Sequence, residues 1–284
     1  MSRELKLRII SAIVLGTITL VVTWLGGVFF AGLVIIVGFL LFYEWSNLTR
    51  TSKRQPLVNF IGWLTLITVS TCIVLSTLEW ALVSMCVGAI LAAAMGWGKA
   101  KNIWVSVGIL YSSFPIIAFT ELRGDETSGF YDQMGLFAIL FLFVVVWATD
   151  IFAYFCGRSL GGPKLAPSIS PGKTWSGAIF GLIAGVGGGI CIVLLISSGG
   201  GYFVPIVAVV LSISSQIGDL FESWVKRRFG QKDSSNLIPG HGGFMDRLDG
   251  LIFASIAAFL IALLDQFYAG TDASHVLAIH LLGL

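Results

Sequence analysis

Residues 134–155, MGLFAILFLFVVVWATDIFAYF, decide the fold, because this long apolar stretch carries a single charged residue, Asp150. A helix needs about 20 mostly apolar residues to cross the hydrocarbon core of a bilayer, and this stretch is long enough. The whole chain has the same character: 56% of its 284 residues are hydrophobic and 11% are charged, whereas soluble domains carry about 25% charged residues. The sequence therefore predicts an integral membrane protein.

Further apolar stretches alternate with charged or glycine-rich segments along the chain. The predicted spans are Ile9–Trp24, Val28–Tyr43, Phe60–Ser76, Trp80–Met95, Ile103–Phe119, Met134–Phe155, Ala178–Ser197, Phe203–Ile217 and Leu251–Phe267. The predicted fold is an all-α, polytopic membrane protein with about nine transmembrane helices. With the N-terminus in the cytosol, every Lys and Arg except Arg123 falls on the cytosolic side, so we expect the C-terminus outside.

The charge balance and the cysteines exclude several classes of protein. Lys and Arg number 17 and Asp and Glu 15, which leaves a net charge of +2. This balance does not favour a nucleic-acid partner. The four cysteines lie in or beside apolar stretches without a C-x-x-C pair. Neither a disulfide framework nor a zinc site is therefore indicated.

The polar chemistry is concentrated in the second half of the chain. Residues 1–133 hold about five predicted spans and keep their polar residues mainly in loops. Residues 134–284 hold about four spans and most of the unusual polar residues. We expect the first region to be a set of transmembrane helices and the second to be the catalytic transmembrane region.

One polar cluster follows the eighth predicted span. Asp219, Glu222, Ser223 and Lys226 recur at intervals of three or four residues and so share one face of a helix. A carboxylate near the bilayer is costly and usually marks a functional site. The alternative is an ordinary helix end that emerges into water, where Glu222 and Lys226 form an i, i+4 ion pair.

The second cluster is the segment 240–250, GHGGFMDRLDG, which leads into the last span. If the last helix begins near Phe244, Asp246 and Asp249 lie on one face of its first turn, where their oxygens could bind hard cations. The neighbouring glycines leave backbone N–H groups open to phosphate. The alternative is a glycine-rich turn whose acidic residues simply favour a helix N-terminus.

Basic residues accompany both clusters, and further polar residues lie upstream. The basic residues are Lys226, Arg227, Arg228, Lys232 and Arg247, which together with the carboxylates could hold magnesium and a polyphosphate. The alternative is the ordinary excess of positive charge on the cytosolic side.

Asp150 needs a partner if it is buried, or else is satisfied at the cytosolic end of its span. The segment 168–174, SISPGKT, is not a P-loop, because Pro167 replaces the first glycine; its alternative is a capping turn with a lipid-facing lysine.

These residues together resemble a known signature. The elements SWVKR at 223–227, Lys232-Asp233, Pro239, HGGF at 241–244 and DRLD at 246–249 are similar to the signature of the integral-membrane phosphatidate cytidylyltransferases. Asp150, Tyr154, Gly157-Arg158, Ser170-Pro171, Lys173-Thr174 and Gly218-Asp219 also match that pattern. The resemblance covers residues 150–250, and Ser176 departs from it where the family has a glutamate.

The resemblance implies transfer of a cytidylyl group from CTP to phosphatidic acid, which forms CDP-diacylglycerol and diphosphate in phospholipid biosynthesis. It implies an Mg²⁺-dependent enzyme of the cell (inner) membrane with its active site facing the cytosol, and it leaves room for a homodimer. The implied catalytic residues are Asp219, Lys226, Arg227, Asp246 and Asp249, of which Asp219, Asp246 and Asp249 hold metal, with Asp150 as an addition to the site. The implied substrate-binding residues are Ser170, Lys173, Thr174, Ser223, Lys232, His241, Gly242, Gly243 and Arg247.

Two rival functions fit less well. In a transporter, an ion would bind to, or protons would pass along, Asp150, Asp219, Asp246 and Asp249. No comparable ionisable residues continue toward the outer face. An enzyme that consumes CDP-linked lipids would carry D-G-x-x-A-R followed by further aspartates. Here Asp249-Gly250 is followed by apolar residues instead.

Overall fold

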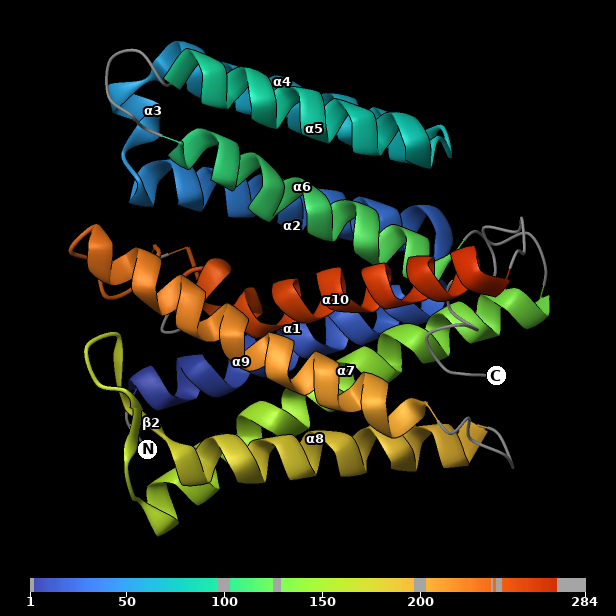
Figure 1. Cartoon of the computed structure of the whole chain (residues 1–284), viewed down its shortest axis with the longest axis vertical. Coiled ribbons are helices and arrows are strands. Elements are labelled where there is room, and N and C mark those ends of the chain that lie inside the picture. The colour runs from blue at the N-terminus through green and yellow to red at the C-terminus, as the bar shows by residue number, and fades with distance from the viewer. Residues whose placement is uncertain are drawn as a thin grey trace. The chain divides into compact units, whose positions relative to one another are not determined.

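The computed structural model describes residues 3–96, 103–124, 129–196, 203–235, 237–238 and 242–269. Each predicted span overlaps a helix of its own, with bounds that differ by a few residues (Figure 1). The helices are α1 (Arg3–Leu25), α2 (Gly27–Leu48), α3 (Thr51–Arg54), α4 (Pro56–Val74), α5 (Leu78–Gly96), α6 (Trp104–Arg123), α7 (Gly129–Leu160), α8 (Trp175–Ile196), α9 (Val204–Arg228) and α10 (Met245–Ala269).

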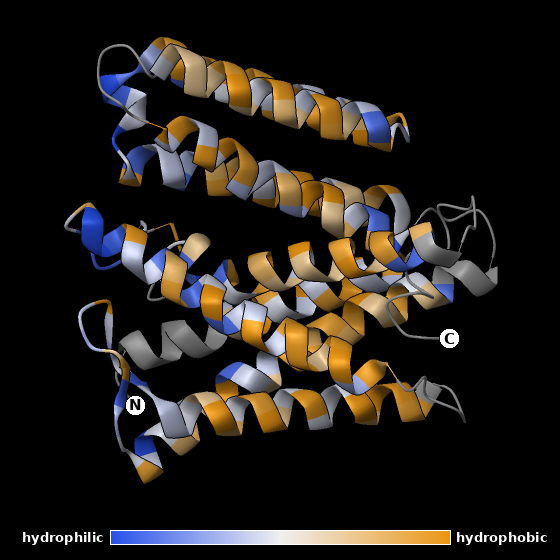
Figure 2. Ribbon diagram, viewed as in Figure 1, coloured by the Kyte–Doolittle hydropathy of each residue, from blue (hydrophilic) through white to orange (hydrophobic). Residues whose placement is uncertain are grey.

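The length and composition of these helices confirm a polytopic membrane protein. Within the described ranges, 8 helices are long and apolar enough to cross a membrane, namely α2 and α4 to α10. The apolar part of α1, Ser11–Leu25, is shorter. Hydrophobic residues cover most of α4, α5 and α8, while hydrophilic residues gather at α3 and at the C-terminal end of α9 (Figure 2). The orientation of the helices in a membrane stays a prediction.

The structure adds one element to the predicted all-α fold. Strands β1 (Lys164–Ala166) and β2 (Ser170–Thr174) form a small antiparallel hairpin between α7 and α8. Gly161 and Gly162 precede it with φ angles of 63° and 102°, a region that favours glycine. At the other end, the Thr174 hydroxyl accepts a hydrogen bond from Gly177 N at 3.1 Å. Thr174 therefore caps the first turn of α8, but Lys173 pairs with Asp219 and is not the lipid-facing lysine of the capping alternative.

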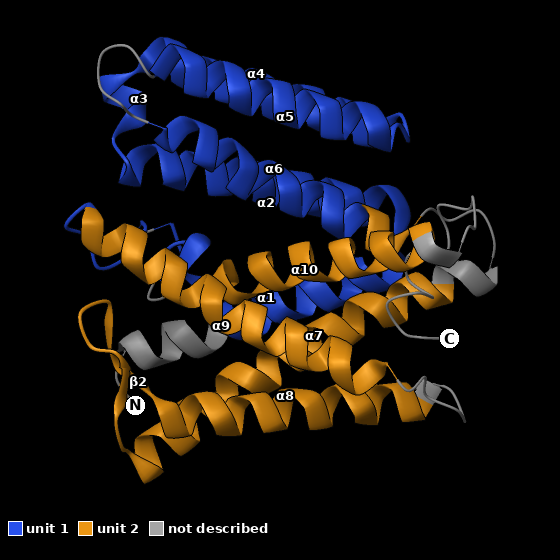
Figure 3. Cartoon of the chain, viewed as in Figure 1, with its two compact units in different colours: residues 1–120, 229–247 blue, residues 121–228, 248–284 orange. Residues whose placement is uncertain are grey.

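The chain forms two compact units that do not follow the order of the sequence (Figure 3). Unit 1 contains residues 1–120 and 229–247, and unit 2 contains residues 121–228 and 248–284. The predicted division after residue 133 lies inside unit 2, within α7. The segment 229–247, which carries much of the signature, packs with the N-terminal helices.

The core of unit 1 is built around aromatic residues of α2. The indole nitrogen of the fully buried Trp45 donates a hydrogen bond to the Trp104 carbonyl at 2.7 Å. Its ring lies 5.0 Å from that of Tyr111 in α6. Phe42 presses against Gly62 in α4, where a Cβ would lie 2.1 Å from the Phe42 ring. Small residues thus let these helices approach closely.

A stripe of glycines in α8 lets it pack closely against α7 in unit 2. Gly177, Gly181, Gly185 and Gly189 recur every four residues along one face of the helix. A Cβ at Gly181 would lie 2.7 Å from the carbonyl oxygen of Thr149 and 3.0 Å from the Ala153 Cβ. Close packing of small residues holds membrane helices together, since lipid supplies no hydrophobic driving force between them.

This packing predicts a site-specific effect of alanine in α8. We expect Gly181→Ala to destabilise the protein by about 1–3 kcal/mol, because the added methyl group must displace the backbone of α7. Thermal unfolding in detergent measures the effect. Gly187→Ala in the same helix is the control, because a Cβ there meets nothing within 4 Å. Equal unfolding temperatures for the two variants would contradict the close packing.

Candidate active site

Unit 2 brings together four carboxylates from three helices. Asp150 comes from α7, Asp219 and Glu222 from α9, and Asp249 from α10. The Asp249 carboxyl group interacts electrostatically with Asp219, Glu222 and Asp150. Asp150 also interacts electrostatically with Asp219 and Lys173. Residues up to 99 positions apart in the sequence therefore form one acidic cluster, which we call the carboxylate cluster.

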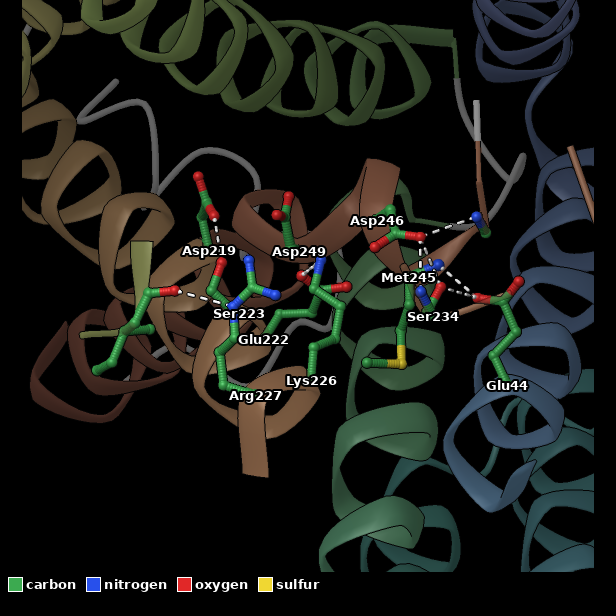
Figure 4. Close-up of polar contacts among 12 residues, drawn as sticks. Glu44, Asp219, Glu222, Ser223, Lys226, Arg227, Ser234, Met245, Asp246 and Asp249 are labelled. Atoms are coloured by element: carbon green, nitrogen blue, oxygen red, sulfur yellow. Dashed lines mark hydrogen bonds and ion pairs between the residues drawn. The ribbon is translucent and has the colours of Figure 1, made fainter. Parts of the chain in front are cut away.

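Two lysines pair with members of the carboxylate cluster. Lys173 in β2 forms an ion pair with Asp219, whose Oδ1 also accepts a hydrogen bond from the Ser223 hydroxyl at 3.4 Å (Figure 4). Lys226 pairs with Glu222 one helical turn away, with 2.5 Å between Nζ and Oε2. The i, i+4 ion pair expected from the sequence is confirmed. It does not lie at an exposed helix end, because the Glu222 side chain is 0% exposed and the Lys226 side chain is 13% exposed.

Close contact between α9 and α10 brings the carboxylates near one another. A Cβ at Gly218 would lie 2.4 Å from the carbonyl oxygen of Asp249. A Cβ at Gly250 would lie 3.2 Å from the carbonyl oxygen of Ser215. The two glycines thus allow the backbones to meet immediately beside Asp219 and Asp249. This approach explains why a glycine precedes Asp219 and another follows Asp249.

The β1–β2 hairpin supplies the other predicted residues of unit 2. Ser170 and Lys173 lie in β2, and Lys173 reaches Asp219 in α9. The Arg227 Nε donates to the carbonyl of Ile169 in the hairpin turn, at 3.4 Å. The hydroxyl of Ser176, which stands where the resemblance has a glutamate, donates to the Gly161 carbonyl. The hairpin therefore joins the ends of α7, α8 and α9.

Asp246 lies in unit 1, where its carboxylate organises the glycine-rich turn. Its Oδ2 accepts hydrogen bonds from Gly243 N at 2.9 Å, Ser234 N at 2.9 Å and Ser234 Oγ at 2.8 Å. Gly242 has a φ of 84°, and a Cβ there would lie 2.8 Å from Asp246 Oδ2. A glycine is required at this position on both counts. The helix begins at Met245, next to the predicted start.

The structure reveals a carboxylate that the sequence analysis missed. Glu44 in α2 is completely buried and accepts hydrogen bonds from Ser235 Oγ at 2.5 Å, Phe244 N at 2.9 Å and Met245 N at 2.7 Å (Figure 4). One feature of the sequence could have indicated it, because Glu44 is the only charged residue between Arg8 and Arg50. A lone carboxylate in such a segment marks a site but does not identify its partner.

The remaining predicted residues belong to unit 1. Lys232 is exposed in the turn after α9, Arg247 is exposed in the first turn of α10, and Gly243 is buried against Glu44 and Ser234. His241 lies outside the described residues. Among the residues that are described, no three carboxyl, imidazole or thiol groups lie close enough to hold a metal ion together. The metal-binding role of Asp219, Asp246 and Asp249 stays a prediction.

The buried pair of α9 predicts a large effect on stability. We expect Lys226→Met to lower the free energy of unfolding by about 3–5 kcal/mol, because it removes the Lys226 ammonium group from the buried Glu222 carboxylate. A second substitution, Glu222→Gln, should restore much of the loss. Thermal unfolding of both variants checks this, with the exposed Lys232→Met as control. A Lys226→Met variant as stable as the control would contradict it.

Comparison with known proteins identifies the family of this chain. A family model described as the cytidylyltransferase family matches residues 6–265. A phosphatidate cytidylyltransferase of Brucella abortus biovar 1 (strain 9-941) is 47% identical over 257 residues, which cover 90% of this chain and 93% of the relative. One from Haemophilus influenzae is 34% identical over 88% of this chain and 96% of the relative. One from Bacillus subtilis (strain 168) is 36% identical over 58% of each. The chain belongs to the cytidylyltransferase family.

Proposed function

We propose that this protein is a phosphatidate cytidylyltransferase, which transfers a cytidylyl group from CTP to phosphatidic acid. Two relatives that this chain matches over most of their length carry that name. Within the molecule, the proposal rests on the carboxylate cluster and its two lysines. These residues lie among helices that are apolar enough to span a membrane. Carboxylates and cations side by side suit a reaction between two phosphate-bearing substrates.

The reaction needs positive charge more than it needs a base. A phosphate oxygen of phosphatidic acid attacks the α-phosphorus of CTP, and the bond from that phosphorus to the bridging oxygen of the diphosphate breaks. The nucleophile is already an anion, so no hydroxyl has to be deprotonated. The enzyme must instead bring two anions together and stabilise the charge on the leaving diphosphate. The residues suited to this are Lys173, Lys226 and Arg227.

The acidic residues of unit 2 fit a magnesium ion. Asp150 and Asp249 form no ion pair within the described residues, so the carboxylate cluster has more carboxyl groups than lysine partners. Mg²⁺ is usually held by one or two carboxylates together with phosphate oxygens of the substrate. We propose Asp219 and Asp249 as those carboxylates and Asp246 as a further catalytic residue. Bound Mg²⁺ would neutralise developing charge on the phosphates.

The hydroxyl and glycine residues of the signature have supporting roles in this proposal. Ser223 orients Asp219 by donating to its Oδ1, and Thr174 holds the first turn of α8 next to Lys173. Ser170, Lys232, His241, Gly242, Gly243 and Arg247 are proposed to contact phosphate groups. The excess of basic residues in the predicted cytosolic loops supports an active site that faces the cytosol, and the bacterial relatives support a location in the inner membrane.

Loss of a proposed metal ligand should abolish the reaction. We expect Asp249→Asn to lower kcat for Mg²⁺-dependent diphosphate release at least ~100-fold, a loss typical of removing one charge-stabilising group. Asp265→Asn is the matched control, since this exposed aspartate lies in the same helix, roughly 24 Å further along at 1.5 Å per residue. The assay uses purified protein with CTP, phosphatidic acid and Mg²⁺. No release from folded wild-type protein would overturn the proposed function.

Loss of the lysine in the hairpin should weaken the use of CTP. We expect Lys173→Gln to lower kcat/KM for CTP by about 10- to 100-fold, because a cation beside the phosphates is removed. Lys164→Gln in the neighbouring strand is the control and should change kcat/KM less than about twofold, since exposed charges contribute little. Similar losses in both variants would show that general positive charge, and not the position of Lys173, matters.

A further inference from the structure

The Glu44 carboxylate is the acceptor for one end of a distant helix. It receives the backbone N–H groups of Phe244 and Met245, which follow it by 200 and 201 residues. The first N–H groups of a helix have no acceptor within the helix, and the N-terminal end attracts negative charge. Helices usually obtain this cap from a Ser, Thr, Asp or Asn next to their first residue. In α10 a glutamate of α2 performs this task.

The turn before α10 is shaped to receive this carboxylate. A Cβ at Gly243 would lie 2.6 Å from Glu44 Oε1 and 2.7 Å from Oε2, so no larger residue can occupy that position while Glu44 stays in place. Ser235 Oγ donates to Oε1 at 2.5 Å. Hydroxyl groups and backbone N–H groups surround both carboxylate oxygens, and such bonds to a charged group are the strong ones.

A single hydroxyl connects Glu44 with Asp246. Ser234 Oγ lies 3.2 Å from Glu44 Oε2 and 2.8 Å from Asp246 Oδ2. A serine hydroxyl has one hydrogen to donate, so the two carboxylates share it. The backbone N–H of Ser234 also donates to Asp246 Oδ2, at 2.9 Å. A shift of the Glu44 carboxylate therefore moves Ser234 and the first turn of α10, both of which hold Asp246.

We propose that Glu44 is a positioning residue of cytidylyl transfer: it fixes the turn 242–246 and so sets the position of the Asp246 carboxylate. This role rests on the proposed function. Glu44 acts through Asp246, which belongs to the proposed site, and not on the substrate. Misplacing a catalytic group by about 1 Å can cost 100-fold in rate, so a residue that places the turn affects kcat without forming part of the chemistry.

The variant Glu44→Gln isolates the effect of the second carboxylate oxygen. Glutamine has nearly the same shape, but its NH₂ group is a donor and must replace one of the two acceptor oxygens. A serine hydroxyl can rotate to accept from it, whereas a backbone N–H cannot. Glutamine at position 44 therefore loses the hydrogen bond to either Phe244 or Met245. Glu79→Gln is the matched control, because Glu79 belongs to the same unit but is exposed at the start of α5.

The decisive experiment is a double-mutant cycle on kcat in the diphosphate-release assay. It uses wild type, Glu44→Gln, Asp246→Asn and the double variant, with thermal unfolding measured in parallel. We expect Glu44→Gln to lower kcat by about 10- to 100-fold with the KM for CTP changed less than about twofold. In the Asp246→Asn background, the same substitution should change kcat no further. Hydrogen exchange of one of the two amides, that of Phe244 or that of Met245, should become faster in Glu44→Gln, and both should stay unchanged in Glu79→Gln.

The outcomes separate this role from a purely structural one. If Glu44 only stabilised the fold, Glu44→Gln would lower the unfolding temperature and reduce activity by the same factor in both backgrounds; that result would overturn the proposal. An unchanged kcat in Glu44→Gln, with active wild type, would also overturn it and leave the proposed function intact. Inactive wild type would instead overturn the function itself, and with it this role.

A milder variant keeps the test decisive if Glu44→Gln does not fold. Ser235→Ala removes one hydrogen bond to Glu44 Oε1 and retains the carboxylate. We expect kcat to fall about threefold to tenfold, in line with the loss of one hydrogen bond to a charged group, with the KM for CTP unchanged. The effect should again vanish in the Asp246→Asn background. A fall of equal size in that background would overturn the proposal.

Discussion

A carboxylate buried in the apolar body of a membrane protein must receive hydrogen-bond donors or cations, because burying an uncompensated charge is too costly. This constraint governs both units. In unit 1 neutral donors meet it, since hydroxyl and backbone N–H groups surround Glu44. In unit 2 cations meet it in part, since Lys173 and Lys226 each pair with one carboxylate.

Neutral donors hold a carboxylate in place without cancelling its charge, so they suit a residue whose task is geometry. Glu44 holds a turn and a helix end, and the bonds it accepts are directional. The carboxylate cluster has more carboxyl groups than lysine partners, which leaves ligands for additional cations, and the lysines in turn favour phosphates. A site that has to bind both a metal ion and a polyphosphate needs this mixture, because carboxylates alone would repel the nucleotide.

Glycine makes these arrangements possible by letting groups approach where a side chain would not fit. Gly243 leaves room for the Glu44 carboxylate, and Gly218 lets α9 meet the backbone of α10 beside Asp249. The stripe in α8 serves helix packing, mainly against α7. The same residue type therefore supports the fold in one helix and the site in another. The distinction becomes visible only when the atom opposite each glycine is known.

The sequence by itself determined the membrane class, the position of nearly every helix and the family, because apolar stretches of spanning length and a contiguous signature are local properties of the chain. It also indicated the pair Glu222–Lys226, since i, i+4 neighbours meet on any helix. Only the tertiary structure revealed that this pair is buried, that residues 229–247 pack with the N-terminal helices, and that Glu44 caps α10. Contacts across 200 residues depend on how helices pack, and a single sequence carries no record of that packing.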